Sequence, residues 1–154
     1  DDLKQKLKRA KGTVFVAIES LYSMDGDLAP VESIYTICEA NNALLIIDEA
    51  HAGGVLGDEG KGLSLNLNIF ARLVTFGKAY GSHGAVVLSS NKVKDYLINF
   101  ARSFIYTTAL PFESYNRIND VLTKQNELNI SRNSLRENIF YFRRKYNNRR
   151  ARCK

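Results

Sequence analysis

The chain has 154 residues, of which 45% are apolar, with two cysteines and a formal net charge of +6. This length and composition are typical of a globular protein with one buried core, and no apolar stretch approaches the roughly 18 residues of a membrane span. The first residues are too polar for a signal peptide, and two cysteines give no disulfide framework. We therefore expect a cytoplasmic protein that does not contact a membrane.

The positive charge is concentrated at the C-terminal end. Residues 143–154 hold seven of the 22 basic residues and no acid, which leaves 15 basic against 16 acidic residues, a net charge of −1, elsewhere. Such a tail can bind nucleic acid or an acidic partner, but no basic patch interleaved with aromatic residues supports this elsewhere. We interpret residues 143–154 as a solvated tail after a globular part, residues 1–142, and predict no nucleic-acid partner.

The first part of the chain alternates strands and helices, as α/β proteins do. Residues Thr13–Ile18 form a short, nearly continuous apolar run, which predicts a strand covered on both faces. A helix is expected to begin at Pro30 and to end at Asn41-Asn42, before a second strand over Ala43–Ile47. The predicted buried stripe of this helix is Val31, Ile34, Ile37, Cys38 and Ala40.

A glycine-rich loop then leads to two short strands, Arg72–Thr75 and Gly84–Leu88. The gap of about eight residues between them is too short for a helical crossover, so the second strand should run antiparallel to the first or lie elsewhere. A helix capped by Asn91 follows, and two more helices are expected over about residues 112–128 and 132–148. The predicted inward side chains of the Asn91 helix are Val93, Tyr96, Leu97 and Phe100.

Polar residues follow the predicted strands at their carboxyl ends, where open α/β sheets bind ligands. Asp48 follows the second strand, Thr75 closes the third, and Lys78 lies in the next loop. A lysine in this place can form a Schiff base with the aldehyde of pyridoxal phosphate, a cofactor that needs an acid against its pyridine nitrogen. Asp48 is the candidate acid, His51 can hydrogen-bond the phenolic oxygen or stack near the ring, and Thr75 with nearby backbone N–H groups can hold the phosphate.

The same residues allow other interpretations. The letters from Asp48 to His51 also spell a helicase ATPase motif, but no G-x-x-x-x-G-K-[ST] phosphate loop precedes them. His51 and His83 are the only histidines and lack zinc-ligand spacing, so we predict no metal site. We interpret His83 as an exposed side chain rather than a residue at the mouth of the cofactor site. Taken alone, Lys78 is an ordinary surface lysine, so its assignment depends on the motifs around it.

Four segments resemble, in order, motifs of the α-oxoamine synthases. Glu19–Pro30 is similar to ES-x-(F/Y)-SMDGD-x-AP, and Asp48–Gly57 is similar to DEAHA-x-GVLG. Thr75–Gly81 is similar to T-x-GKA-x-G, and Arg102–Pro111 is similar to RSFI-(F/Y)-(S/T)-TALP. The resemblance implies the aminotransferase-like (fold type I) architecture of pyridoxal-phosphate enzymes, with a mostly parallel sheet, flanking helices and a homodimer. Residues 1–142 would be the central part of its large domain, within a longer enzyme.

The resemblance also implies roles for individual residues. Lys78 would carry the cofactor and later move the α-proton of the substrate, with Asp48 and His51 as the other catalytic residues. Thr108, or its neighbour Thr107, would reach the cofactor phosphate of the partner subunit. The residues assigned to cofactor binding are Ser23, Asp48, His51, Thr75, Lys78 and Thr108. The residues that stack on the ring and bind the substrate would lie outside this chain.

The reaction implied by the resemblance is the condensation of an amino acid with an acyl thioester, with loss of carbon dioxide. The lysine loop and the Ser82–Ala85 segment after it most resemble the 8-amino-7-oxononanoate synthases, which join L-alanine to pimeloyl-CoA or pimeloyl-ACP in biotin biosynthesis. Serine palmitoyltransferase and 2-amino-3-ketobutyrate CoA ligase share most of the same residues and remain alternatives. An inactive fragment that keeps only the fold is a further alternative.

Overall fold

The computed structural model describes the backbone of residues 2–152 and the side chains of residues 2–146. The described residues form one sheet whose strands lie in the order β1 (Phe15–Glu19), β2 (Leu44–Asp48), β3 (Ala71–Thr75) and β4 (Ala85–Ser89). β1, β2 and β3 run parallel, and β4 runs antiparallel to β3, the first of the two alternatives that the short connection allowed. The predicted α/β class with a mostly parallel sheet is therefore confirmed.

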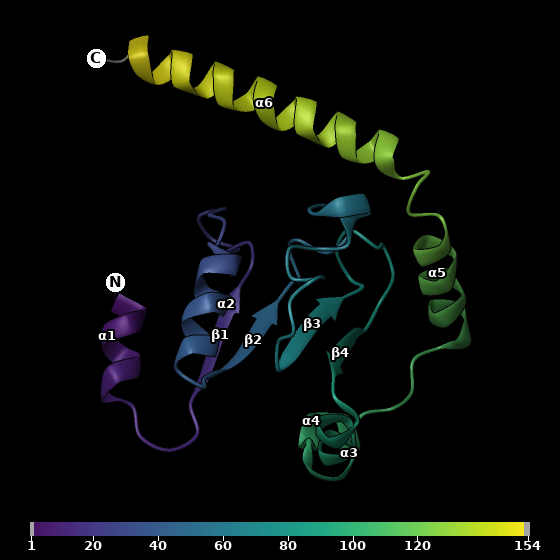
Figure 1. Ribbon diagram of the computed structural model, residues 1–154. Coiled ribbons are helices and arrows are strands. Elements are labelled where there is room, and N and C mark those ends of the chain that lie inside the picture. The colour runs from purple at the N-terminus through teal and green to yellow at the C-terminus, as the bar shows by residue number, and fades with distance from the viewer. Residues whose placement is uncertain (1, 153–154) are drawn as a thin grey trace.

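Helices lie around this sheet (Figure 1). Their bounds are α1 (Asp2–Arg9), α2 (Val31–Ala40), the short 3-10 helix η1 (Asp58–Gly60), α3 (Asn91–Phe100), α4 (Arg102–Ile105), α5 (Phe112–Thr123) and α6 (Asn129–Arg152). α2 packs on β1 and β2, whereas the long α6 runs past the end of the sheet above η1. Within the described residues, no helix has both the length and the apolar content needed to cross a bilayer.

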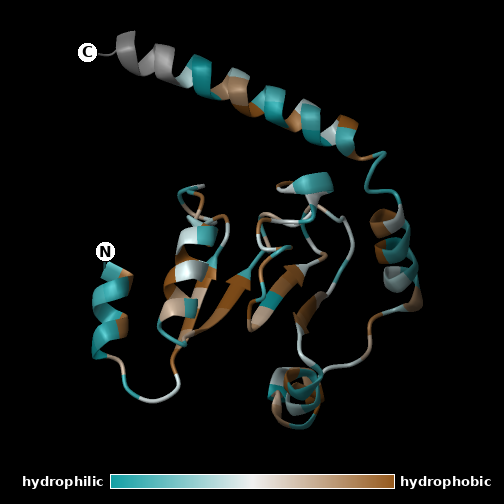
Figure 2. Ribbon diagram, viewed as in Figure 1, coloured by the Kyte–Doolittle hydropathy of each residue, from teal (hydrophilic) through white to brown (hydrophobic). Residues whose placement is uncertain are grey.

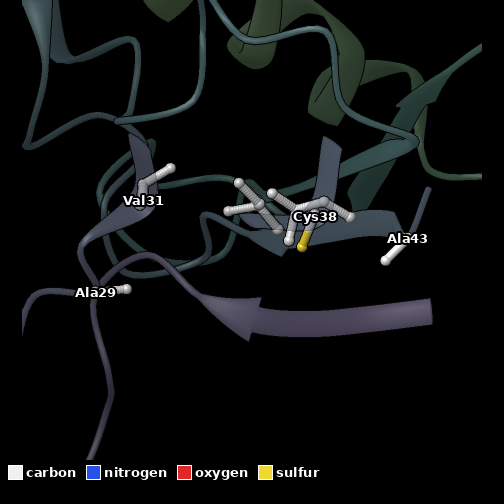
Figure 3. Packing of buried hydrophobic residues seen from close by; sticks show 6 residues of the cluster. Ala29, Val31, Cys38 and Ala43 are labelled. Carbon is white, nitrogen blue, oxygen red and sulfur yellow. The ribbon is translucent and has the colours of Figure 1, made fainter. Parts of the chain in front are cut away.

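The core lies between α2 and one side of the sheet, which we call the helix face. Side chains alternate along a strand, so Leu45 and Ile47 of β2 point to this face and are almost fully buried. They cluster with Val31 and Cys38 of α2, as predicted for Cys38 (Figure 3). Hydropathy colouring shows that the strands are mainly apolar and that α6 is mainly polar (Figure 2). Burial raises the pKa of the Cys38 thiol.

The opposite side of the sheet, which we call the open face, corrects one prediction. β1 was expected to be covered on both faces, but it is an edge strand, and Phe15 is 54% exposed. Val16 and Ile18 are half-buried on the helix face, while Phe15 and Ala17 point to the open face. Within the described residues, β1 is therefore covered on the helix face only, although its apolar residues occupy both faces. The strand also begins at Phe15 rather than at Thr13.

Predicted helix boundaries and inward faces were partly wrong. α3 is capped by Ser90, whose hydroxyl accepts from the N–H of Val93, rather than by Asn91. Tyr96 and Phe100 are exposed, not inward, and stack on each other, whereas Val93 and Leu97 are half-buried. In the α2 stripe, Ala40 is exposed because it lies in the last turn.

α1 and α4 were not predicted, because α1 is short and polar and α4 has a single turn. α5 and α6 occupy the regions where two polar helices were expected, although α5 ends at Thr123 and α6 begins at Asn129. α6 runs without a break past residue 143, where the basic tail was predicted to begin. Cys153 and Lys154 lie outside the described residues.

Candidate active site

Two neighbouring parallel strands place Asp48 and Thr75 on the same side of the sheet. Asp48 ends β2 and lies opposite Glu19 of β1 and Leu73 of β3. Leu73 and Thr75 are two residues apart on β3, so both point to the open face together with Asp48. The carboxylate and hydroxyl that the sequence placed at strand ends therefore share one edge and one face, as expected.

His51 and Lys78 meet at this edge. The Nζ of Lys78 lies 2.9 Å from the Nε2 of His51, although 27 residues separate them. A protonated amine can only donate, so this contact requires His51 Nε2 to present a lone pair whenever Lys78 is charged. His51 is half-buried and Lys78 is exposed. The amine is therefore held by an imidazole but is accessible from solvent.

The loops that carry these two residues pack closely against each other. Gly54 has a φ of +83°, and a Cβ there would lie 2.8 Å from the Cβ of Ala79 in the lysine loop. Glycine is needed for both reasons, since other residues rarely adopt this φ and would clash. Tyr80 is buried beneath Gly53 and Gly54 and packs edge-on against Phe76. Burial raises the pKa of the Tyr80 phenol, partly opposed by the charge of Arg72.

The lysine loop is closed by its own backbone and supported by α5. The N–H of Phe76 donates to the carbonyl of Gly84 over 2.8 Å, and the N–H of Ser82 donates to the carbonyl of Phe76 over 2.8 Å. From α5, the Nε of Arg117 donates to the carbonyl of Gly81 over 2.5 Å. The position of Lys78 is therefore set by β3, β4 and α5 together.

Two unused polar atoms fit the cofactor that the sequence predicts. The Oγ1 of Thr75 is buried and has no hydrogen-bond partner among the described residues, a costly arrangement unless an acceptor binds there. A phosphate oxygen would be such an acceptor. Asp48 Oδ1 accepts from the N–H of Ala50 over 2.7 Å, which leaves Oδ2 for another donor, such as a protonated pyridine nitrogen. The residues present therefore fit pyridoxal phosphate.

No hydrogen bond joins Ser23 or Thr108 to Lys78 among the described residues. Ser23 is exposed in the turn after β1, and its N–H donates to Oε2 of Glu19 over 3.2 Å. Thr108 is exposed between α4 and α5 and lines a cavity of about 600 Å³ together with Thr107 and His83. His83 is exposed, as interpreted from the sequence, and it also borders this cavity. The roles of Ser23 and Thr108 remain predictions from the resemblance.

Two buried charged residues beside the site were not singled out from the sequence. Glu49 has no solvent exposure and is surrounded by hydrogen-bond donors. Strand alternation is a signal for it, since Glu49 continues the inward series of Leu45 and Ile47. Arg132 of α6 is 5% exposed and donates to the carbonyl of Gly54 over 3.4 Å. No local pattern predicts this contact, which joins residues 78 positions apart.

Comparison with known proteins identifies the family. The family profile "Aminotransferase class I and II" matches residues 1–153. The chain belongs to this family. The α-oxoamine synthase resemblance within it is confirmed by the relatives, which include 8-amino-7-oxononanoate synthases from Emericella nidulans and Pectobacterium atrosepticum. The first is 49% identical over 70% of the chain, and the second is 38% identical over 96% of it.

Solved structures of an 8-amino-7-oxononanoate synthase and of a serine palmitoyltransferase share the fold. The 8-amino-7-oxononanoate synthase of Francisella tularensis is 33% identical, with a TM-score of 0.75, over 91% of this chain and 42% of that one. The serine palmitoyltransferase of Sphingomonas wittichii is 26% identical, with a TM-score of 0.82, over 90% of this chain and 36% of that one. The chain spans only 28% and 39% of the lengths of the Emericella and Pectobacterium relatives.

Proposed function

We propose that this chain carries the lysine-bearing part of a pyridoxal-phosphate-dependent C-acyltransferase. The enzyme would condense an amino acid, L-alanine, with pimeloyl-CoA or pimeloyl-ACP and release carbon dioxide and the free thiol, as in biotin biosynthesis. The observation that carries this proposal is the contact of Lys78 with His51 beside Asp48 and Thr75. The names of the relatives support the choice of reaction.

Each residue of the site has a role that its position permits. Bound pyridoxal phosphate supplies an electron sink for negative charge on the α-carbon of the amino acid. Lys78 Nζ would hold the cofactor covalently and afterwards remove and return the α-proton, with His51 Nε2 as its 2.9 Å neighbour. Asp48 Oδ2 would accept from the pyridine N–H, and its negative charge would keep that nitrogen protonated.

The phosphate and ring contacts complete the proposed set. Thr75 Oγ1 would donate to a phosphate oxygen, and Ser23 would contact the cofactor from the turn after β1. Thr108 would reach the phosphate bound to the partner subunit of a homodimer. We assign residues 1–142 to the cofactor-binding large domain and residues 143–154 to a solvated basic tail. We place the enzyme in the cytoplasm.

Another α-oxoamine synthase is the second candidate. Solved structures of serine palmitoyltransferase match the fold with TM-scores up to 0.82, but at lower identity than the 8-amino-7-oxononanoate synthases. Assays that pair L-alanine, L-serine and glycine with pimeloyl, palmitoyl and acetyl thioesters separate the candidates. Highest kcat/KM for L-alanine with a pimeloyl thioester supports the first, and a clear preference for any other pair contradicts it.

The cofactor assignment is tested in the complete gene product by adding pyridoxal phosphate and reducing with borohydride. We expect a visible absorption band and a reduced adduct on the peptide that contains Lys78. Lys78→Ala should remove both, whereas Lys61→Ala should keep both, because Lys61 is an exposed lysine paired with Glu59. An intact protein without an adduct, or an adduct that survives Lys78→Ala, contradicts the proposal. The absence of an adduct in an intact protein is also what we expect if the chain keeps only the fold and is inactive.

A further inference from the structure

A fully buried carboxylate lies next to the candidate site. Glu49 follows Asp48 directly, and its Oε1 accepts from the N–H of Leu63 over 2.9 Å and from the N–H and hydroxyl of Ser64 over 2.8 and 2.7 Å. Its Oε2 accepts from the hydroxyl of Ser20 over 2.7 Å. Four donors therefore satisfy a charge that burial would otherwise penalise.

The surroundings of this carboxylate are tightly fitted. The Nε of Arg72 lies 3.8 Å from Glu49 Oε1, an ion pair in which the arginine side chain is 12% exposed. Gly62 has a φ of +86°, and a Cβ there would lie 2.8 Å from the Cδ of Glu49 and 2.5 Å from Nη2 of Arg72. Only glycine therefore allows the loop before Leu63 to close over the ion pair.

The backbone of Glu49 is continuous with the candidate site. Its N–H donates to the carbonyl of Leu73 over 2.9 Å, which extends the pairing of β2 with β3 past Asp48. Its carbonyl accepts from the N–H groups of Ala52 and Gly53 over 3.0 and 2.7 Å, and His51 lies inside this turn. A displacement of Glu49 must therefore move Asp48 on one side and His51 on the other.

The Ser20 contact ties the same point to β1. The N–H of Ser20 donates to the carbonyl of Asp48 over 2.9 Å, while its hydroxyl donates to Glu49. Ser20 is fully buried, as Glu49 is. The carboxylate thus joins the ends of β1 and β2, the arginine of β3 and the Leu63–Ser64 loop at the place where the site residues begin.

We propose that Glu49 is a positioning residue of the pyridoxal-phosphate site. Its carboxylate holds the turn from Asp48 to Gly53 in one conformation, so that Asp48 and His51 stand at fixed positions relative to Lys78. Glu49 itself touches neither cofactor nor substrate, because it points to the helix face of the sheet. This inference rests on the proposed function, since it concerns the geometry of that cofactor site.

The test compares three variants of the complete gene product loaded with pyridoxal phosphate. Glu49→Leu removes every acceptor. Glu49→Gln keeps an oxygen for Leu63 and Ser64, while its amide donates to the oxygen of Ser20, whose hydroxyl hydrogen can turn toward the carbonyl of Asp48, 3.4 Å away. Ile47→Val is the matched control, because Ile47 of β2 is fully buried on the same face, two residues before Glu49, but has no side-chain hydrogen-bonding group.

Three readouts are measured on each variant: the Kd for the cofactor, the pH midpoint of its visible band, and the melting temperature without cofactor. Glu49→Leu should raise the Kd at least about tenfold, the size of effect seen when a residue that supports a metal ligand is lost. It should also shift the pH midpoint of the visible band. Glu49→Gln should rescue the Kd to within about threefold of the original value, because the acceptor contacts persist. Ile47→Val should lower the melting temperature only.

The outcomes separate the two proposals. A wild-type protein without a Lys78-linked band contradicts the proposed function itself. A wild-type band together with an unchanged Kd and midpoint in Glu49→Leu overturns the positioning role. The same holds if Ile47→Val gives equal changes, because the effect would then be general destabilisation. If Glu49→Leu does not fold, Ser64→Ala and Ser20→Ala each remove one donor and should raise the Kd in the same direction; unchanged values in both also overturn the proposal.

Discussion

The adjacent acids Asp48 and Glu49 lie on opposite faces of the sheet and have opposite surroundings. Asp48 points to the open face, is half-buried, and uses one oxygen to accept from the N–H of Ala50. Glu49 points to the helix face, is fully buried, and uses both oxygens to accept from neighbouring donors. Asp48 is left available for a ligand, whereas Glu49 is fully occupied by the protein.

The difference shows how a buried polar network can support an accessible one. On the helix face, Glu49 accepts four hydrogen bonds and forms an ion pair with Arg72, although the Nε of Arg72 is 3.8 Å away and makes no hydrogen bond. On the open face, the Thr75 hydroxyl has no partner of either kind among the described residues. The hydrogen-bonded Glu49 carboxylate can hold one conformation of its turn, whereas the unpaired Thr75 hydroxyl lies at the ligand-binding edge of the sheet, where a ligand can complete it. Changes on the helix face should therefore reduce stability first, and changes on the open face should reduce binding and activity first.

The largest expected effect is the loss of stability in Arg72→Met. The substitution leaves the charge of Glu49 buried without a counterion and should lower the free energy of unfolding by about 3 kcal/mol. We take the low end of the usual range because the pair is 3.8 Å apart and four other donors remain on Glu49. Urea denaturation without cofactor measures it, with the exposed Arg136→Met as control. A loss below about 1 kcal/mol would show that Arg72 adds little to the network.

Asp48→Asn, on the open face, should reduce activity strongly and stability little, the reverse of Arg72→Met. The new amide oxygen still accepts from the N–H of Ala50, so the free energy of unfolding should change by less than about 1 kcal/mol. Without the negative charge, the pyridine nitrogen is no longer held protonated, and kcat/KM should fall at least about 100-fold. Steady-state kinetics and denaturation of the same preparation test both parts. A large loss of stability would show that the two faces are not separable at this strand end.

Gly62→Ala tests how closely the loop approaches the ion pair. The added Cβ meets both Glu49 and Arg72 at a φ of +86°, so we expect a loss of about 2 kcal/mol or more in stability. Gly12→Ala is the matched control, because its φ is +74° but nothing lies within 4 Å, and only the backbone strain of about 1 kcal/mol should remain. Equal losses in the two variants would show that the closeness of Gly62 to the ion pair is unimportant.

The smallest effect is expected for Thr75→Val. The side chains have similar shape, and the hydroxyl that is removed has no partner among the described residues, so stability should be unchanged or slightly higher. The Kd for pyridoxal phosphate should rise about tenfold, because a hydrogen bond to a charged phosphate is lost. Isothermal titration with the cofactor measures this change. Wild-type affinity would place the phosphate elsewhere and leave the buried hydroxyl without an explanation.

The sequence predicted the sheet better than the outer helices. The strands have strong apolar runs, and the short connection before β4 left two alternatives, an antiparallel pairing with β3 or a place elsewhere, of which the structure shows the first. Burial in α3 was predicted from periodicity alone, which failed for Tyr96 and Phe100 because that helix lies at the edge of the described structure. The cap of α3 was missed by one residue, since Ser90 and Asn91 are both good capping residues.

The sequence by itself determined the identity of the candidate site residues, because strand ends and motifs are local patterns. It placed Asp48, Thr75 and Lys78 correctly at one end of the sheet. Only the tertiary structure decided that His51 Nε2 meets Lys78 Nζ, and that Glu49 is enclosed by Ser20, Ser64 and Arg72. These contacts join residues up to 29 positions apart, and no local periodicity encodes them. They depend on strand register and loop closure, which set distances between segments that are remote in the chain.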